Sequence, residues 1–351
     1  MLSIKTKLLQ NLVSKLNKCS SSRLLEITRY WHIIADDQGI EIVAMDGNNY
    51  MTVLCNDVKG ELDVIVRADQ FGKLVEKTSS EKITMKQKEN YLSVIGNGEY
   101  KVEIVVGEDY PEYDSLMDDE SIEPVVVDTK YLKSIAAINK STVSNTNTDG
   151  FLTGYLMTPK AAITSDAIKV CINPIEFIPD TVLLTPEMVK MVQAITDESC
   201  DVYYKDGMIE FVGSDTIIYG AEMDGKEEFP DLQEYARAKL PSKGKVSKCG
   251  IQQIVDRLTL FLGEFDKGDI LLTFKDKVLN VQTKSGSYER IELVPDEGNT
   301  DDFTCSINVT FLKDIISSIS NETFFICYGE DGYVKIEDDG VIYVLATNEE
   351  E

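Results

Sequence analysis

The stretch that decides the fold runs from Gln70 to Glu112 and reads QFGKLVEKTSSEKITMKQKENYLSVIGNGEYKVEIVVGEDYPE. It predicts one short helix followed by three strands, because helical spacing gives way to strand-like runs broken by polar turns. The turn Gly96-Asn97-Gly98 contains Asn-Gly, a strong β-hairpin signal. The predicted elements are a helix at Gln70–Lys77, strands at Lys82–Lys86, Tyr91–Ile95 and Tyr100–Val106, and a closing Asp109-Tyr110-Pro111-Glu112.

The same order of elements returns twice, which indicates an internal repeat. Phe71, Met188 and Phe311 mark the three helices and are spaced by 117 and 123 residues, and the closures at Tyr110-Pro111 and Phe229-Pro230 are 119 residues apart. The second copy comprises a helix at Pro186–Ile195, strands at Cys200–Tyr204, Met208–Val212 and Thr216–Met223, and the closure Glu228–Asp231; the third comprises a helix over Phe311–Ile319 and strands at Thr323–Tyr328, Tyr333–Ile336 and Val341–Leu345.

Each copy is preceded by a similar segment, a strand followed by a helix at Thr6–Leu16, Thr129–Asn139 or Lys248–Leu262. The chain therefore reads as three tandem domains, each built from two β-α-β-β-β halves, in the α+β class. The predicted domains are residues 1–118, 124–235 and 243–351. Short amphipathic helices should cover one face of antiparallel sheets, and a closed array of such units would have no exposed strand edges.

Composition narrows the class of protein. The 351 residues are 43% hydrophobic and 27% charged, as in a globular protein with a sizeable core. The sequence has no apolar run long enough for a membrane helix, so we expect no membrane association. The cysteine number is odd and no CxxC pair occurs, which favours a reducing cytoplasm over a disulfide framework or a zinc site: Cys19, Cys55, Cys171, Cys200, Cys249, Cys305 and Cys327.

The formal charge of −26 argues against nucleic acid unless basic residues gather on one surface. The helical windows 5–18, 70–77, 129–141, 186–195, 245–262 and 309–320 together hold fourteen basic and four acidic residues. A basic helical face on an acidic protein can bind the phosphate backbone and repel DNA elsewhere. The predicted DNA-facing residues are Lys7, Lys15, Lys18, Lys73, Lys77, Lys130, Lys133, Lys140, Lys190, Lys248, Arg257 and Lys313.

Over essentially its whole length the chain resembles the bacterial DNA polymerase III beta subunit, the beta sliding clamp family. The altered features described below would fit a divergent phage or mobile-element member. Each motif alone is weak, but their order and spacing across three domains are specific. The motifs are Ala44-Met45-Asp46, Val66–Phe71, Asp109–Tyr113, Leu152-Thr153-Gly154-Tyr155-Leu156, Phe229-Pro230-Asp231-Leu232, Asn308-Val309 and Ile342–Leu345.

The resemblance implies a processivity factor for DNA replication: a homodimeric ring that encircles double-stranded DNA without sequence preference, with helices facing the DNA and sheets facing outward. Arg23 lies in the loop where the family has a DNA-contacting arginine. Domain 1 of one chain would meet domain 3 of the other. The residues implied at this dimer interface are Tyr100, Val102, Ile104, Phe261, Leu262 and Ile291.

The family also has an apolar cleft that accepts a short peptide motif from the DNA polymerase, the clamp loader and repair proteins. Two features of the sequence depart from the family: the stretch Thr164–Lys169 replaces Thr-Asp-Gly-His-Arg, and the tail ends in three glutamates. The peptide preference is therefore expected to differ. The matching cleft positions are Leu152, Thr164, Ile168, Pro230, Tyr235, Val344 and Ala346.

Two other classes of protein compete with the clamp. An enzyme would need a positioned catalytic group, and the single histidine, His32, lies in a predicted strand without an evident partner. We expect no catalytic residue, metal or cofactor. The second alternative is a non-enzymatic, repeat-built interaction or structural protein that never encloses DNA, which the charge of −26 favours slightly.

Overall fold

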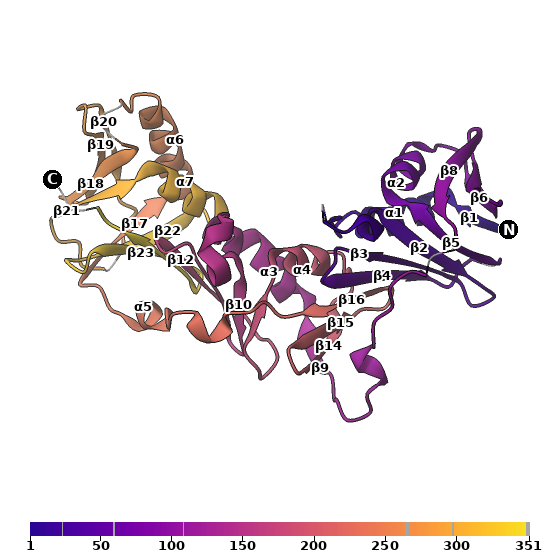
Figure 1. The fold of residues 1–351 in the computed structure, drawn as a ribbon. Helices are drawn as coiled ribbons and strands as arrows, with labels where there is room; N and C mark the ends of the chain where they lie inside the picture. The colour runs from indigo at the N-terminus through magenta and orange to yellow at the C-terminus, as the bar shows by residue number, and fades with distance from the viewer. Residues whose placement is uncertain (23, 59, 108, 264–266, 297, 349–351) are drawn as a thin grey trace. The chain divides into compact units, whose positions relative to one another are not determined.

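The structure is a computed structural model that describes residues 1–351 except 23, 59, 108, 264–266, 297 and 349–351, and it does not describe the side chains of 147–149. The order strand, helix and three strands occurs six times along the chain (Figure 1). We call each such segment a half. The first two halves are β1 (Leu2–Lys5), α1 (Thr6–Leu16), β2 (Tyr30–Ala35), β3 (Ile40–Met45), β4 (Asn49–Cys55), and β5 (Leu62–Arg67), α2 (Ala68–Lys77), β6 (Lys82–Gln87), β7 (Tyr91–Ile95), β8 (Glu99–Val105).

The remaining four halves repeat this order. They are β9 (Val125–Asp128), α3 (Thr129–Ile138), β10 (Tyr155–Thr158), β11 (Ala161–Ser165), β12 (Lys169–Pro174); β13 (Val182–Leu184), α4 (Pro186–Val192), β14 (Ser199–Lys205), β15 (Met208–Val212), β16 (Thr216–Ala221); β17 (Ser242–Ser247), α6 (Lys248–Thr259), β18 (Asp269–Lys275), β19 (Val278–Thr283), β20 (Tyr288–Glu292); and β21 (Phe303–Asn308), α7 (Val309–Ser318), β22 (Thr323–Tyr328), β23 (Tyr333–Asp338), β24 (Val341–Ala346). The prediction of a mixed α+β chain of six β-α-β-β-β halves is confirmed.

The leading strands are exchanged between neighbouring halves. β1 pairs with β6 in the sheet β1-β6-β7-β8, and β5 joins β2-β3-β4; the same exchange occurs with β9 and β13, and with β17 and β21. Each half therefore supplies one strand to the sheet of its neighbour. The strands pair antiparallel throughout, as predicted.

Two further pairings join the last strands of different halves. β4 pairs with β16, with Tyr50 opposite Tyr219, and β12 pairs with β24, with Val170 opposite Val344. A third, shorter pairing joins β5 to the end of β8, with Ile65 opposite Val105 and Val66 opposite Ile104, so the sheets have twelve, eight and four strands. We refer to the β4–β16 and β12–β24 pairings as the internal joints.

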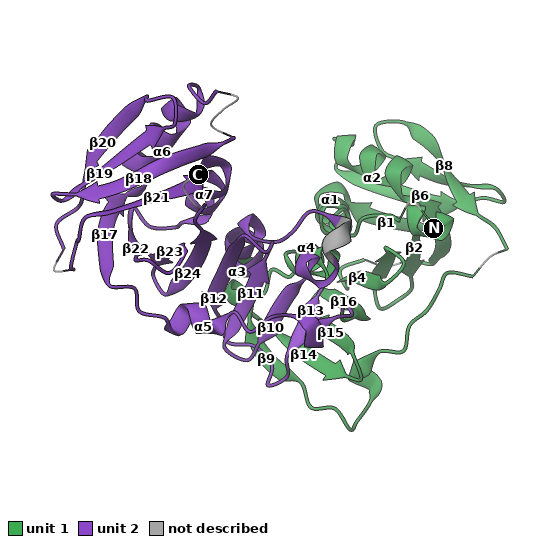
Figure 2. Cartoon of the chain, turned by 60° about the vertical axis from the view of Figure 1, so that its left-hand side comes forward, with its two compact units in different colours: residues 1–133, 185–222 green, residues 134–184, 223–351 purple. Residues whose placement is uncertain are grey.

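By contacts the chain divides into two compact units, residues 1–133 with 185–222, and residues 134–184 with 223–351 (Figure 2). The twelve-stranded sheet lies in unit 1 and the other two sheets lie in unit 2. The three domains 1–118, 124–235 and 243–351 therefore stay a prediction based on the repeat.

The helices form where they do because each has one apolar face and a defined start. On α1, Leu9, Leu12, Val13 and Leu16 are buried, and burying each stabilises the fold by about 1.5–3 kcal/mol. Side chains cap three helix starts: Thr185 accepts from Met188 N, Ser247 from Gly250 N, and Asn308 from Thr310 N.

Tight turns fix the strand registers. Asp206 and Gly207 both have positive φ, 49° and 79°, in the two-residue turn between β14 and β15. Positive φ at both positions matches the right-handed twist of a hairpin, and glycine adopts it without strain. The hairpins β18–β19 and β23–β24 use two positive-φ residues in the same way.

The observed helices differ from the predicted ones mainly at their ends. α2 begins at Ala68 and so includes Asp69, while α4 ends at Val192 and α6 at Thr259. A short helix, α5 (Gln233–Arg237), was not predicted, and β17 begins at Ser242, one residue before the predicted start of the third domain. No helix among the described residues is long and apolar enough to cross a membrane.

Candidate functional site: a basic helical face, an apolar cluster and two strand edges

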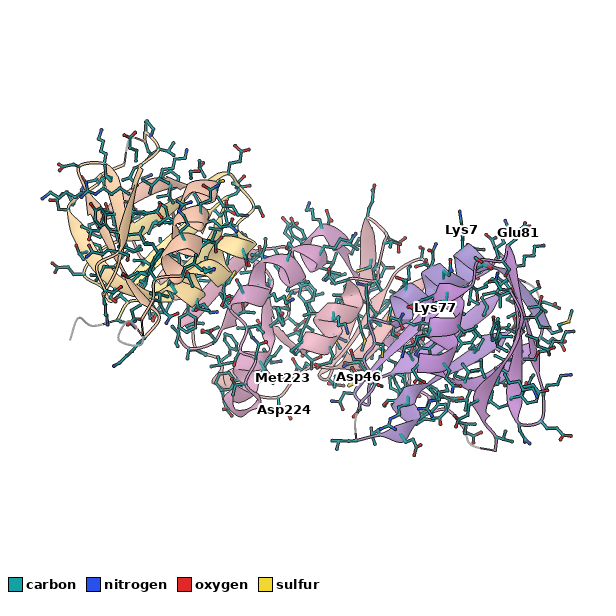
Figure 3. All side chains as sticks on the ribbon, turned by 90° about the horizontal axis from the view of Figure 1, so that it is seen from above. Lys7, Asp46, Lys77, Glu81, Met223 and Asp224 are labelled. Atoms are coloured by element: carbon teal, nitrogen blue, oxygen red, sulfur yellow. The ribbon has the colours of Figure 1, made fainter. Side chains whose placement is uncertain are left out.

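The exposed faces of the helices carry lysines with no ion-pair partner among the described residues. On α1 and α2 these are Lys7, Lys73 and Lys77, and Figure 3 shows Lys7 and Lys77 on these two helices. The two helices are held together by Gln10, whose Nε2 donates to the carbonyls of Val75 and Thr78, both at 3.0 Å. Lys133 on α3 is also exposed, and Lys18 and Lys140 follow α1 and α3 directly. Such lysines can contact phosphate without first breaking an ion pair.

Other predicted DNA-facing residues already have partners in the chain. Lys15 is only 12% exposed, and its Nζ lies 2.5 Å from Asp215 Oδ1. The remaining partnered residues are Lys130 with Asp128, Arg257 with Glu289, Lys313 with Asp256, Lys190 with the hydroxyl of Ser20, and Lys248 with the carbonyl of Ile319. Arg23 lies outside the described residues. The ion pair with Asp215 makes Lys15 less available to phosphate than the exposed lysines, and the DNA-facing role of all these residues stays a prediction.

The helices are also less basic than their predicted windows. Helices α1, α2, α3, α4, α6 and α7 carry ten basic and five acidic residues, a net charge of +5. The predicted windows were more basic because they included flanking lysines such as Lys5 and Lys18, and because they left out Asp69. The helices are still net positive while the whole chain carries a net charge of −26.

A second feature is an apolar cluster in unit 2, on the sheet face turned away from α6 and α7. Along β24, Val344 belongs to this cluster, whereas Tyr343 and Leu345 belong to the core that contains residues of α6 and α7. Alternate strand residues point to opposite faces, which places the two clusters on opposite sides of the sheet. The buried members are Leu156, Ala161, Ile163, Val170, Ile172, Leu183, Phe229, Leu232 and Val344, and the partly exposed ones are Phe151, Leu152, Met223, Tyr235, Ala236, Tyr333 and Ile342.

The structure brings several predicted cleft residues to this cluster. Leu152, Tyr235 and Val344 are members. Ile168 is 43% exposed in the turn between β11 and β12, and its carbonyl accepts from Ala346 N at 3.1 Å. Pro230 is exposed directly after Phe229.

Thr164 lies elsewhere. Its side chain is fully buried and its hydroxyl lies 2.6 Å from that of Thr142, within a polar network that includes Asn139. Because Ile163 faces the apolar cluster, its neighbour Thr164 faces the helical layer. Thr164 therefore lies on the opposite face of the sheet from the apolar cluster, because a motif in the sequence does not fix which face a strand residue takes.

Sequence reasoning missed Phe151, Met223, Tyr333 and Ile342 as members of the apolar cluster. One signal was available: Val341–Leu345 is apolar at every position, and a strand with this pattern is buried on both faces. Ile342 could have been found from it.

The third feature is the pair of last strands that take no part in the internal joints, β8 and β20; β20 is the last strand of its sheet, and β8 pairs with β5 only through Ile104 and Val105, which leaves residues 99–103 as an open edge. Tyr100 on β8 is 44% exposed, Tyr288 on β20 is 57% exposed, and Phe261 after α6 is 60% exposed. Leu260, 80% exposed, was not predicted. Exposed apolar side chains beside strand edges are typical of an interaction surface.

Other residues assigned to the dimer interface are part of the chain's own core. Val102 and Ile104 are buried, and Leu262 packs partly against the core of unit 2. Ile291 lies against Gly250, where an added Cβ would come within 2.3 Å of its Cδ1. These side chains support the edges from behind, whereas Tyr100 and Phe261 are exposed beside them.

The hydrogen-bond pattern shows which backbone groups of the two edges are available. Gly96 N donates to Gly98 O, and bonded pairs alternate along an antiparallel ladder, so Glu99, Lys101 and Glu103 direct their N–H and C=O groups away from β7. The N–H of Glu103 donates to Gln70 Oε1 at 3.4 Å, which leaves Glu99 and Lys101 as the available donors. On β20, Leu293 N bonds Lys277 O and Thr283 N bonds Ser287 O. By the same alternation the outward groups belong to Tyr288, Arg290 and Glu292.

Titratable groups elsewhere are perturbed mainly by burial. Burial raises the pKa of the Cys200 and Cys327 thiols to about 12, the reverse of an activated nucleophile. His32 Nε2 lies 2.8 Å from Asp63 Oδ1, and that carboxylate is 79% exposed. No group of three or more metal-ligating side chains occurs among the described residues.

Comparison with solved structures defines the class of fold, which is that of the three-domain bacterial DNA polymerase III beta subunits. The beta subunit of Thermotoga maritima has a TM-score of 0.87 at 16% identity, covering 100% of this chain and 99% of that chain. The beta chain of Streptococcus pneumoniae TIGR4 gives 0.85 at 16%, with 100% of both chains covered. A sliding clamp of Pseudomonas aeruginosa bound to griselimycin gives 0.86 at 13%, with 99% of both covered.

No protein-family model matches the chain, and no curated protein matches it in sequence. At identities of 13–16% the structural likeness establishes the fold.

Proposed function

We propose that this chain is a DNA sliding clamp, a non-enzymatic processivity factor that closes as a homodimer around duplex DNA and tethers a polymerase to it. The observation that carries the proposal is the six-fold repeat with two unused joints, in a fold that matches clamp structures over 99–100% of the chain. Two internal joints use four of the six last strands. If β8 of one chain pairs with β20 of a second, two further joints close the array.

The internal joints also predict the register of this pairing. Lys101 corresponds to Tyr219 and Val344, because each is paired with the third residue of the preceding strand, a buried polar residue in every case. Those partners are Ser93, Glu210 and Lys335.

On the other side of the joint, Tyr288 corresponds to Val170, since each is paired with the fifth residue of its preceding strand. Val170 and Val344 pair in the chain. The equivalent pairing places Lys101 opposite Tyr288 and, two residues on, Glu99 opposite Arg290.

The backbone supports this register independently, because Lys101, Glu99, Tyr288 and Arg290 are all outward-facing residues of their edges. The side chains are also complementary. Glu99 meets Arg290 as an ion pair, and Lys101 meets the ring of Tyr288, the kinds of cross-strand pair that each contribute about 0.2–1 kcal/mol.

We propose that the ring encircles duplex DNA. The support is the exposed lysines Lys7, Lys73, Lys77 and Lys133 on the helices, which have no ion-pair partner in the described part of a strongly acidic chain. Contacts of this kind are directed to phosphate and carry no sequence information, which lets a ring slide. Partner proteins such as the polymerase and the loader would bind the apolar cluster of unit 2 through a short peptide.

Negative-stain electron microscopy of the purified protein tests the assembly. The proposal predicts two-chain rings with six lobes and a hole wide enough for duplex DNA. Compact particles without a hole would contradict it. They would favour the alternative, an interaction protein built from the same repeat that does not enclose DNA.

A further inference from the structure

Exposed acidic residues accompany the apolar cluster of unit 2, and we call these charged surroundings the acidic frame. The segment Met223–Arg237 contributes Phe229, Leu232 and Tyr235 to the cluster. The same segment carries five exposed acidic residues: Asp224, Glu227, Glu228, Asp231 and Glu234. Figure 3 shows Met223, a cluster member, next to Asp224.

The basic residues nearby do little to offset these charges. Lys335, on the strand paired with Val344, is 5% exposed, and its Nζ donates to Ala238 O at 2.8 Å and lies 2.9 Å from Glu337 Oε1. Within the segment itself, Arg237 is exposed and Lys226 is partly buried. Five carboxylates against two cations leave the frame negative.

Tyr333 lies inside this frame. Its ring meets that of Tyr235 edge-on at 5.2 Å. Burial raises the pKa of Tyr333, and the charges of Asp331 and Glu234 raise it further. A phenol that is harder to ionise is the expected effect of nearby negative charge.

We propose that this cluster selects partner peptides whose apolar anchor is flanked by lysine or arginine. The inference rests on the proposed function, because it takes the cluster to be the docking site for partner peptides. The apolar anchor would pack on partly exposed side chains such as Leu152 and Ile342, and the flanking cations would lie beside Glu227, Asp231 and Glu234. Peptides with acidic flanks are repelled, and so is DNA.

Fluorescence anisotropy with two synthetic peptides tests the inference on the full-length protein. The peptides share one core of Gln, Leu and Phe residues, and differ only in two Lys or two Glu residues on the flanks. The Lys-flanked peptide should bind about tenfold tighter or more, equal to about 1.4 kcal/mol. The difference should shrink as salt screens the charges.

A double variant, Glu227→Lys with Glu234→Lys, should reverse the preference. Glu322→Lys, an exposed acidic residue of unit 2 outside the Met223–Arg237 segment and the cluster, is the matched control and should leave it unchanged. Circular dichroism melts of all variants separate lost binding from lost folding.

Equal binding of the two peptides, or tighter binding of the Glu-flanked one, would overturn the inference and leave the peptide site itself intact. If neither peptide binds, both the inference and the proposed peptide site fail, while the ring and its DNA are untouched.

Discussion

Replacing Lys101 by proline should prevent ring closure without unfolding the chain. Lys101 is an exposed residue of β8, and its N–H points away from β7, so the substitution removes no hydrogen bond of the chain's own ladder. Proline is tolerated at such solvent-facing edge positions. In the proposed joint the same N–H donates to the carbonyl of Tyr288 in the second chain.

The loss of this bond costs about 0.5–1.5 kcal/mol, and the stranded carbonyl of Tyr288 can bring the total to about 1–3 kcal/mol for each joint. A two-chain ring contains two such joints, so the whole effect is about 2–6 kcal/mol. The dimer dissociation constant should rise by between about 30-fold and about 20,000-fold.

Sedimentation velocity over a range of protein concentrations measures this change, with Lys101→Ala as the matched control because it keeps the N–H. Arg290→Pro and Arg290→Ala provide the same comparison on the other strand. The reasoning is refuted if Lys101→Pro dimerises as tightly as Lys101→Ala while both keep the wild-type melting temperature.

Three further outcomes follow from the structure. Lys133→Glu should weaken retention on DNA without changing stability, whereas Lys15→Glu, which sets a carboxylate against Asp215, should lower the free energy of unfolding by about 1–3 kcal/mol in chemical denaturation. Ile168→Glu should abolish anisotropy signals from partner peptides and leave dimerisation unchanged, since this side chain is 43% exposed beside the cluster. Burial raises the pKa of Glu210 above its value in the unfolded chain, so the folded state binds the proton of this carboxyl group more tightly. The tighter proton binding stabilises the fold at low pH, and that stabilisation is lost as the pH rises through the pKa of the folded state. Compared with Glu210→Gln, the wild type should lose stability in melts as the pH rises above the ordinary glutamate pKa of about 4.3.

The order of elements could be predicted because the repeat reports it three times over. Phe71, Met188 and Phe311 mark equivalent helices, and all three spacings agree. The helix ends were less certain. Asp69 was excluded from α2 because the strand β5 runs directly into the helix, and no side chain caps its start.

The sequence could not show which lysines are free to contact DNA phosphate and which already form an ion pair within the chain. Lys7 and Lys15 lie on one helix with similar neighbours, yet Lys15 meets Asp215, a residue 200 positions away. Likewise Thr164 and Ile163 adjoin in sequence, and only the strand register decides which one faces the apolar cluster. Contacts that depend on tertiary register require the fold.

The joints were accessible only after the sheets were known. The sequence indicates that β8 and β20 are strands, but only the paired sheets show that the outer edge of β20 and residues 99–103 of β8 have no strand partner among the described residues. The resemblance implies Val102 and Ile104 at the interface because they lie on the edge strand, and the structure buries both side chains inside the chain. Tyr288, whose exposure was not foreseen, is the better candidate.

Topological retention on DNA tests the central claim most directly, and it needs no loading protein. The protein is threaded onto linear duplex DNA carrying biotin at both ends, the ends are then blocked with streptavidin, and the complex is washed in about 1 M salt, where charges are screened within about 3 Å. A closed ring should stay on DNA whose ends are blocked and leave DNA whose ends are open, and Lys101→Pro should be lost from both. Equal loss of the wild type from blocked and open DNA would show that the chain binds DNA only by charge, or not at all, and would contradict the clamp.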